Sequence, residues 1–179
     1  MTTMRCCIVV VAVFLSACVR LPENVTPVEP FVLQRYLGTW YEIARLDHSF
    51  ERGLDSVTAT YSLRDDGDVR VLNRGYSAKD KAWEDAEGRA RFVESPDKGF
   101  LKVSFFGPFY GSYVIMELDQ EHYRYALVCG PNTSYLWILS RTPELEQAIV
   151  ERLISKAQAL GFDTDQLIFV EHRSALAAD

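Results

Sequence analysis

The chain has 179 residues and a formal net charge of −6, and 48% of its residues are hydrophobic. This length suits one domain with a sizeable core. An acidic chain without a block of Lys or Arg is a poor binder of nucleic acid, so we expect no nucleic-acid partner.

Residues 1–17 predict a signal peptide. Arg5 is followed by an apolar run that ends at Ala17. As a helix, this run spans about 18 Å, which is too short for a bilayer core of roughly 30 Å. A short basic start, an apolar core and small residues before the cut are typical of a secretory signal. Such a signal is either an ordinary secretory signal that happens to be followed by Cys18 or a lipoprotein signal, in which this cysteine is modified.

Leu15-Ser16-Ala17-Cys18 resembles a bacterial lipobox. The resemblance implies cleavage before Cys18 and lipidation of this cysteine, which would anchor the mature chain stably to a membrane. Val19 follows in place of an Asp, which favours the outer membrane of a Gram-negative bacterium, with the protein facing the periplasm. The prolines of residues 18–30 predict a short, semi-rigid tether to a domain over residues 31–179.

Eight short segments rich in β-branched and aromatic residues follow, and turn sequences separate them. Asp66-Gly67, between the second and third segments, is a strong hairpin signal. The regular spacing predicts an all-β fold, an antiparallel sandwich or barrel. The expected strands cover residues 39–46, 57–63, 69–76, 82–93, 101–106, 112–118, 123–129 and 135–140.

One amphipathic helix is expected after the strands, because apolar residues recur from Leu145 to Leu160 at helical spacing. Thr142 is the expected N-cap and Gly161 the expected stop. A helix with a single apolar face packs most simply on the outside of a barrel. Residues 167–170 are expected to add a final short strand.

A closed barrel of eight strands encloses a space for side chains or for one small ligand. With Trp40 pointing inward, the alternation places apolar and aromatic residues inside, Leu63 among them, mixed with small residues such as Gly88. We interpret this mixture as a cavity for an acyl chain, with a filled barrel as the alternative. The residues expected to line the lipid pocket are Ala59, Tyr61, Val71, Asn73, Ala90, Phe92, Val103, Phe105, Tyr113, Ile115, Val128, Tyr135 and Trp137.

Gly38-Thr39-Trp40 and Arg141 look like the first and third signature regions of the lipocalins, whereas the middle signature is degenerate over residues 118–123. The longer stretches 38–45, 50–53, 102–111 and 136–143, together with the lipobox, are similar to the bacterial outer-membrane lipoprotein lipocalins. The resemblance implies an eight-stranded antiparallel up-and-down barrel with one C-terminal helix outside it. It also implies binding of fatty acids, lysophospholipids or phospholipids, a role in membrane maintenance under stress, and a homodimer.

In such a fold, Gly38, Trp40 and Arg141 form the fold signature, with Arg141 expected over the indole of Trp40 at the closed end. The polar residues 47–53 belong to a loop at the open end.

We expect a binding protein without catalytic residues, metal or cofactor, because the three histidines lack the spacing of metal ligands. Cys129, inside an apolar run, is expected to be a buried small residue. Glu42 shares the inward face of Trp40, so it has either a structural or ligand-orienting role or an acid–base role. The alternatives to a lipid carrier are a lipid-modifying enzyme and a structural lipoprotein with a filled barrel.

Overall fold

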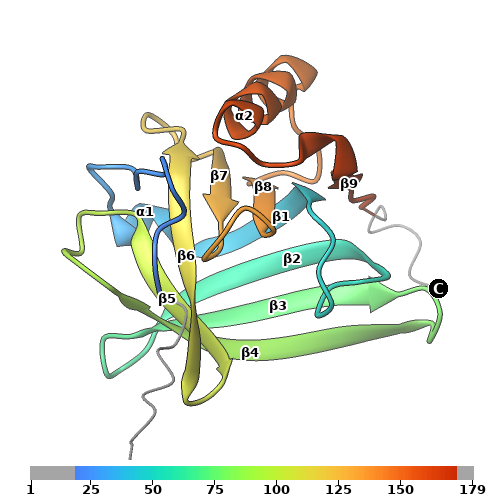
Figure 1. The fold of residues 1–179 in the computed structure, drawn as a ribbon. Coiled ribbons are helices and arrows are strands. Elements are labelled where there is room, and N and C mark those ends of the chain that lie inside the picture. Colours follow the sequence, from blue (N-terminus) through green and yellow to red (C-terminus); the bar gives the residue numbers. More distant parts are fainter. Residues whose placement is uncertain (1–18, 173–179) are drawn as a thin grey trace, which may run out of the picture.

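Nine strands form one antiparallel sheet in a computed structural model that describes residues 19–172. Each of β1 to β8 pairs with its neighbour in sequence, and β8 returns to β1, so the sheet closes into an up-and-down barrel (Figure 1). β9 pairs with β1 beside this ring. The strands are β1 (Gly38–Arg45), β2 (Leu54–Leu63), β3 (Val69–Ser77), β4 (Ala82–Phe92), β5 (Phe100–Phe106), β6 (Phe109–Leu118), β7 (Tyr125–Cys129), β8 (Leu136–Ser140) and β9 (Ile168–Phe169).

The predicted barrel is confirmed, and the largest differences lie at strand ends. β2 begins at Leu54, earlier than expected, because a bulge near Ser56 lets the strand continue through an irregular segment. β6 begins at Phe109, so the turn after β5 consists of Gly107 and Pro108 alone.

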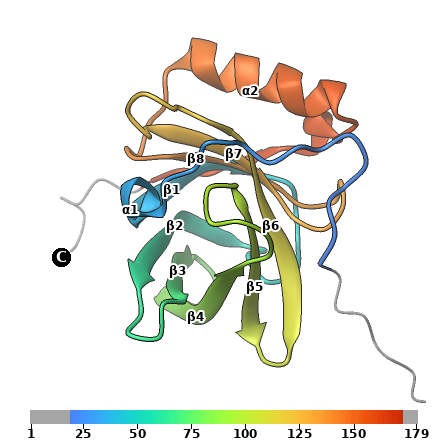
Figure 2. The same ribbon diagram turned by 90° about the vertical axis from the view of Figure 1, so that its left-hand side faces the viewer.

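The predicted helix outside the barrel is α2 (Gln147–Ala159), which lies across one side of the sheet (Figure 2). It begins later than expected, and Thr142 is not its N-cap. The Thr142 hydroxyl donates to the carbonyl of Glu144, which holds these residues in a bend instead of a first helical turn. The short helix α1 (Leu33–Tyr36) and the 3-10 turn η1 (Thr164–Gln166) were not predicted. Within residues 19–172, no helix is long and apolar enough to cross a bilayer.

Buried apolar residues form two clusters on opposite faces of β6, β7 and β8. Successive residues of a strand point to opposite faces, so Leu127 and Ile138 face α2, whereas Val128 and Leu139 face the barrel interior. The helix-side cluster includes Val150 and Leu153 of α2.

Cys129 belongs to the helix-side cluster, where it is fully buried. Burial raises the pKa of its thiol to about 12, which makes it unreactive. This agrees with the expected packing role.

Arg141 and Trp40 close one end of the barrel, as predicted. The guanidinium carbon of Arg141 lies 3.9 Å from the centroid of the Trp40 ring. Arg141 also donates hydrogen bonds to the carbonyls of Thr39, Arg35 and Leu37, at 2.9, 2.8 and 3.0 Å. Gly38, the first residue of β1, has a φ of +95°, a backbone conformation that favours glycine. We call this the closed end and the opposite one, with loop 46–53 and turn 107–108, the open end.

The segment that precedes β1 lies against the barrel along much of its length. Val28 donates its N–H to the carbonyl of Ile115 at 2.8 Å, and Phe31 donates to Asp97 at 2.7 Å. Val25 is buried in the helix-side cluster, with Leu21 packed against it. Residues 19–30, which the sequence assigns to a tether, are therefore attached to the sheet at several points.

Replacing Trp40 by Ala should lower the free energy of unfolding by about 3–5 kcal/mol, because a fully buried aromatic side chain is lost beneath Arg141. Urea denaturation followed by circular dichroism measures the loss. Trp83→Ala is the matched control, since Trp83 is 47% exposed. Equal losses in the two variants would contradict the closing role of Trp40.

Candidate ligand-binding cavity

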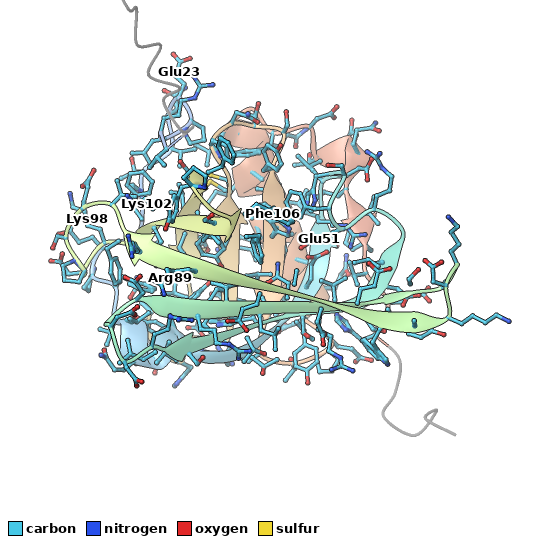
Figure 3. The ribbon with its side chains drawn as sticks, turned by 90° about the horizontal axis from the view of Figure 1, so that it is seen from below. Glu23, Glu51, Arg89, Lys98, Lys102 and Phe106 are labelled. Atoms are coloured by element: carbon cyan, nitrogen blue, oxygen red, sulfur yellow. The ribbon has the colours of Figure 1, made fainter. Side chains whose placement is uncertain are left out.

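A cavity of about 480 Å³ occupies the open half of the barrel, within the range of small-molecule sites. Its wall is mainly apolar and aromatic. Glu51 and Phe106 both line it, and Figure 3 shows them in the same part of the molecule, away from Lys98 of the β4–β5 turn. The predicted pocket residues on the wall are Ala59, Tyr61, Val71, Asn73, Val103, Phe105, Tyr113, Tyr135 and Trp137.

The structure does not place four predicted pocket residues on the cavity wall. Ala90, Ile115 and Val128 are fully buried among side chains of the closed half, and Phe92 packs against the same cluster. The ring of Phe31, inserted from the segment before β1, lies 6.1 Å from that of Phe92. This segment, together with α1, fills the half of the barrel in which the sequence predicted empty space.

Two inferences from alternation and residue size are wrong. Leu63 is 55% exposed at the end of β2, beyond the closed half of the barrel. Gly88 does not leave free space, because a Cβ on it would lie 2.9 Å from the ring of Phe105. The missing side chain instead lets the Phe105 ring lie against β4.

Several wall residues come from the open-end loops, which the sequence analysis did not assign to the pocket. They share exposure to the entrance and lack the two-residue alternation of strands. Phe50 is an aromatic residue within the polar run 47–53, and Phe106 and Phe109 flank Gly107-Pro108. A lone aromatic residue in a polar run is the signal for Phe50, and aromatic residues on both sides of a Gly-Pro turn are the signal for Phe106 and Phe109.

Three tyrosine hydroxyls form the deep end of the cavity. The Tyr113 hydroxyl lies 2.7 Å from the hydroxyl of Tyr36 and 2.7 Å from that of Tyr61. Burial raises the pKa of all three phenols, so they remain protonated. Tyr61 and Tyr113 line the cavity, and their paired hydroxyls separate it from the buried side chains that pack around Trp40.

Buried hydrogen bonds of Arg45 connect β1 to the loop that follows it and to the start of β2. Arg45 Nη1 donates to Glu42 Oε1 at 2.6 Å, and Arg45 Nη2 donates to the carbonyls of Glu51 and Leu54, each at 3.0 Å. A bulge between Glu42 and Ala44 shifts the alternation, so Arg45 reaches the same side as Glu42. Because Arg45 is only 2% exposed, these acceptors replace the water it loses on folding.

Glu51 is the second carboxyl of this cluster. Its Oε2 accepts a hydrogen bond from Trp137 Nε1 at 3.1 Å and lies 3.0 Å from His48 Nε2. Burial alone would raise the pKa of Glu51, but His48 and Trp137 lower it below its ordinary value. Glu51 thus keeps a negative charge on the cavity wall.

The pKa of Glu42 is raised well above its ordinary value. Burial is the largest cause, and the nearby charge of Glu51 adds to it, against the opposing effect of Arg45. Glu42 therefore retains a proton to higher pH than an isolated carboxyl does. Its hydrogen bond to Arg45 gives it a structural partner, which favours the structural role over acid–base chemistry.

Residues 31–172 match the family model of the lipocalin-like domain, which covers most of the chain. The chain belongs to the lipocalin family. This lipocalin is 56% identical over 166 residues to the outer membrane lipoprotein Blc of Vibrio cholerae, an alignment that covers 93% of the chain and 97% of the relative. It is 55% identical over 150 residues to the protein of the same name from Escherichia coli K12, which covers 84% of each.

More distant relatives share the fold. Temperature-induced lipocalin-1 of Arabidopsis thaliana is 37% identical over 145 residues, covering 75% of this lipocalin and 76% of the relative. The structure of insecticyanin from the tobacco hornworm Manduca sexta superposes with a TM-score of 0.68, at 24% identity and with 88% and 89% coverage. At that identity, the superposition concerns the fold alone.

Glu42→Gln should become more stable relative to the wild type as pH rises from 5 to 8. Folding raises the pKa of Glu42 above its ordinary 4.5, so above pH 4.5 the folded wild type binds more protons than the unfolded chain. Its stability therefore falls with rising pH, by at most about 1.4 kcal/mol per pH unit from this group. Glutamine does not titrate and removes that loss.

Urea denaturation at pH 5, 6, 7 and 8 measures the difference. Glu87→Gln is the control, because the exposed Glu87 has a lowered pKa and should give no such gain in this range. Parallel pH profiles for the wild type and Glu42→Gln would contradict the raised pKa.

Proposed function

We propose that this lipocalin binds one single-chain lipid, a fatty acid or a lysophospholipid, in its cavity, and that it stores or transports this lipid for membrane maintenance under stress. The observation that carries the proposal is the apolar cavity of about 480 Å³, which is closed at the Trp40 end and open at the other. An acyl chain fits such a space with its tail toward the tyrosines and its headgroup at the entrance.

A binding protein accounts for the polar groups of the wall better than a lipid-modifying enzyme does. Glu42 is bonded to Arg45, and Glu51 is bonded to Trp137 and lies beside His48. These contacts hold the loop that borders the entrance. The empty space in the open half also argues against a purely structural lipoprotein with a filled barrel.

The proposed location is the outer membrane of a Gram-negative bacterium, with the protein anchored through lipid on Cys18 and facing the periplasm. The lipobox at residues 15–18 and the names of the bacterial relatives support it. The signal peptide, residues 1–17, and Cys18 lie outside the described residues. The homodimer stays a prediction from family resemblance.

The charges at the entrance favour a zwitterionic headgroup over a free fatty acid. Glu51 and Glu84 line the cavity, and Glu84 shares the inward face of β4 with Ala90. Arg74 and Asp85 lie on the outer faces of β3 and β4, where Arg74 Nη1 is 3.7 Å from Asp85 Oδ2 and the guanidinium stacks over Trp83. A lysophosphatidylethanolamine can place its ammonium near the two inward carboxylates, whereas a fatty-acid carboxylate is repelled by them.

Phe105→Glu should weaken lysophosphatidylethanolamine binding at least tenfold, because it places a charge on the apolar wall. Titration followed by tryptophan fluorescence measures the affinity, since Trp137 lines the cavity. Leu63→Glu is the matched control on an exposed residue and should bind like the wild type. If the wild type shows no saturable binding at micromolar lipid, the carrier function is wrong.

Replacing Glu84 by Gln should narrow the preference for lysophosphatidylethanolamine over palmitate by about 2–5-fold, the effect of an exposed charge. The paired dissociation constants should converge further at high salt, which screens such charges. Glu121→Gln, in a turn at the closed end, provides a control of equal charge change. An unchanged preference in Glu84→Gln would contradict selection by charge.

A further inference from the structure

The β5–β6 hairpin ends in two exposed aromatic side chains. Phe106 is 80% exposed and Phe109 is 66% exposed, with only Gly107 and Pro108 between them. Both residues also border the cavity, and Phe50, 53% exposed, borders it from loop 46–53. Large apolar side chains gathered at one place on a surface mark a contact with an apolar partner. We call residues 106–109 the hairpin tip.

The start of the described chain lies beside this hairpin. The Ser112 hydroxyl accepts a hydrogen bond from the N–H of Arg20 at 2.8 Å and donates to the Arg20 carbonyl at 2.6 Å. Ser112 follows Phe109 by three residues, which is about 10 Å along a strand. Cys18 precedes Arg20 by two residues, which reach at most about 7 Å.

These distances place the proposed lipidation site near the hairpin tip. Arg20 is fixed beside β6 by both of its backbone groups, about 5 Å away as neighbouring strands are, so the backbone of Cys18 would lie within about 22 Å of Phe109. The closed-end turns 64–68 and 119–122 carry mainly charged residues, Asp65 and Glu121 among them. The lipid anchor and the exposed aromatic residues therefore belong to the same end of the molecule.

We propose that the hairpin tip docks on the bilayer that holds the lipidated Cys18, so that the cavity entrance faces the lipid–water interface. Aromatic side chains favour that interface, and an acyl anchor nearby holds them against it. Lipid then passes from the bilayer to the cavity along Phe106 and Phe109 without crossing water. The inference rests on the proposed anchor and deepens the proposed function.

A fluorophore that reports polarity tests the docking in the full lipidated protein, reconstituted in vesicles of phosphatidylethanolamine and phosphatidylglycerol. Phe109→Cys carries the label at the tip, and Asp65→Cys carries it at the closed end as the control. Cys129 is buried and should not react. The label at position 109 should shift to the blue and be quenched at least twofold by lipids with a nitroxide on the acyl chain. The label at position 65 should not change.

The outcomes separate the two proposals. A lipidated protein whose label at position 109 escapes quenching overturns the docking and leaves the cavity function standing. A blue shift without quenching by the spin-labelled lipid means that a second copy of the chain covers the tip, which also overturns it. An unmodified Cys18 in the mass spectrum overturns the anchor and the docking together.

A charge placed at the tip gives a second test with a kinetic readout. Gly107 is outside the cavity wall, and a Cβ there meets no atom within 4 Å, so Gly107→Asp fits the fold. It should slow the uptake of lysophosphatidylethanolamine from vesicles at least fivefold, with unchanged affinity for the dissolved monomeric lipid. Gln120→Asp, at the closed end, should match the wild type in both measurements. Wild-type uptake by Gly107→Asp would overturn the docking.

Discussion

Arg141, the residue that follows β8, connects the last barrel strand to the segment that covers the closed end. Its guanidinium stacks on Trp40 and bonds to carbonyls 102 to 106 residues earlier in the chain. Such long-range contacts form only when β1 and β8 are already neighbours, so closure of the barrel and covering of its end depend on each other.

The division of the interior into a filled and an empty half follows from that closed end. α1 and the residues before it bring Phe31 and Tyr36 into the barrel, where they pack with Trp40. The Tyr113 hydroxyl then marks the boundary, beyond which the wall is apolar. On the other side of the cavity, Arg45 holds the loop 46–53 through the carbonyl of Glu51 and the start of β2 through the carbonyl of Leu54. A cavity built in this way exists before a ligand arrives, so binding does not have to order the chain.

The strands and the closing contact were predictable, whereas the depth of the cavity was not. Alternation tells which face of a strand is inside, and it correctly placed Val71 and Ile115 there; it cannot tell that one lines the cavity and the other is packed beneath it. That difference depends on Phe31, which comes from outside the barrel strands. The contact between Glu42 and Arg45 could not be predicted either. Two residues that are three positions apart in a regular strand point to opposite faces, and only the bulge brings these two side chains to the same face.

The attachment of residues 19–30 to the sheet limits how far the barrel could move from a membrane that held Cys18. With the anchor at Cys18, a free tether of a dozen residues would let the domain swing tens of ångströms from its membrane. Because Arg20 and Val28 are hydrogen-bonded to β6, almost no free chain would remain between such an anchor and the barrel. A protein anchored in this way would stay on its own leaflet, and any lipid exchanged with another membrane would have to be delivered or removed by a separate carrier.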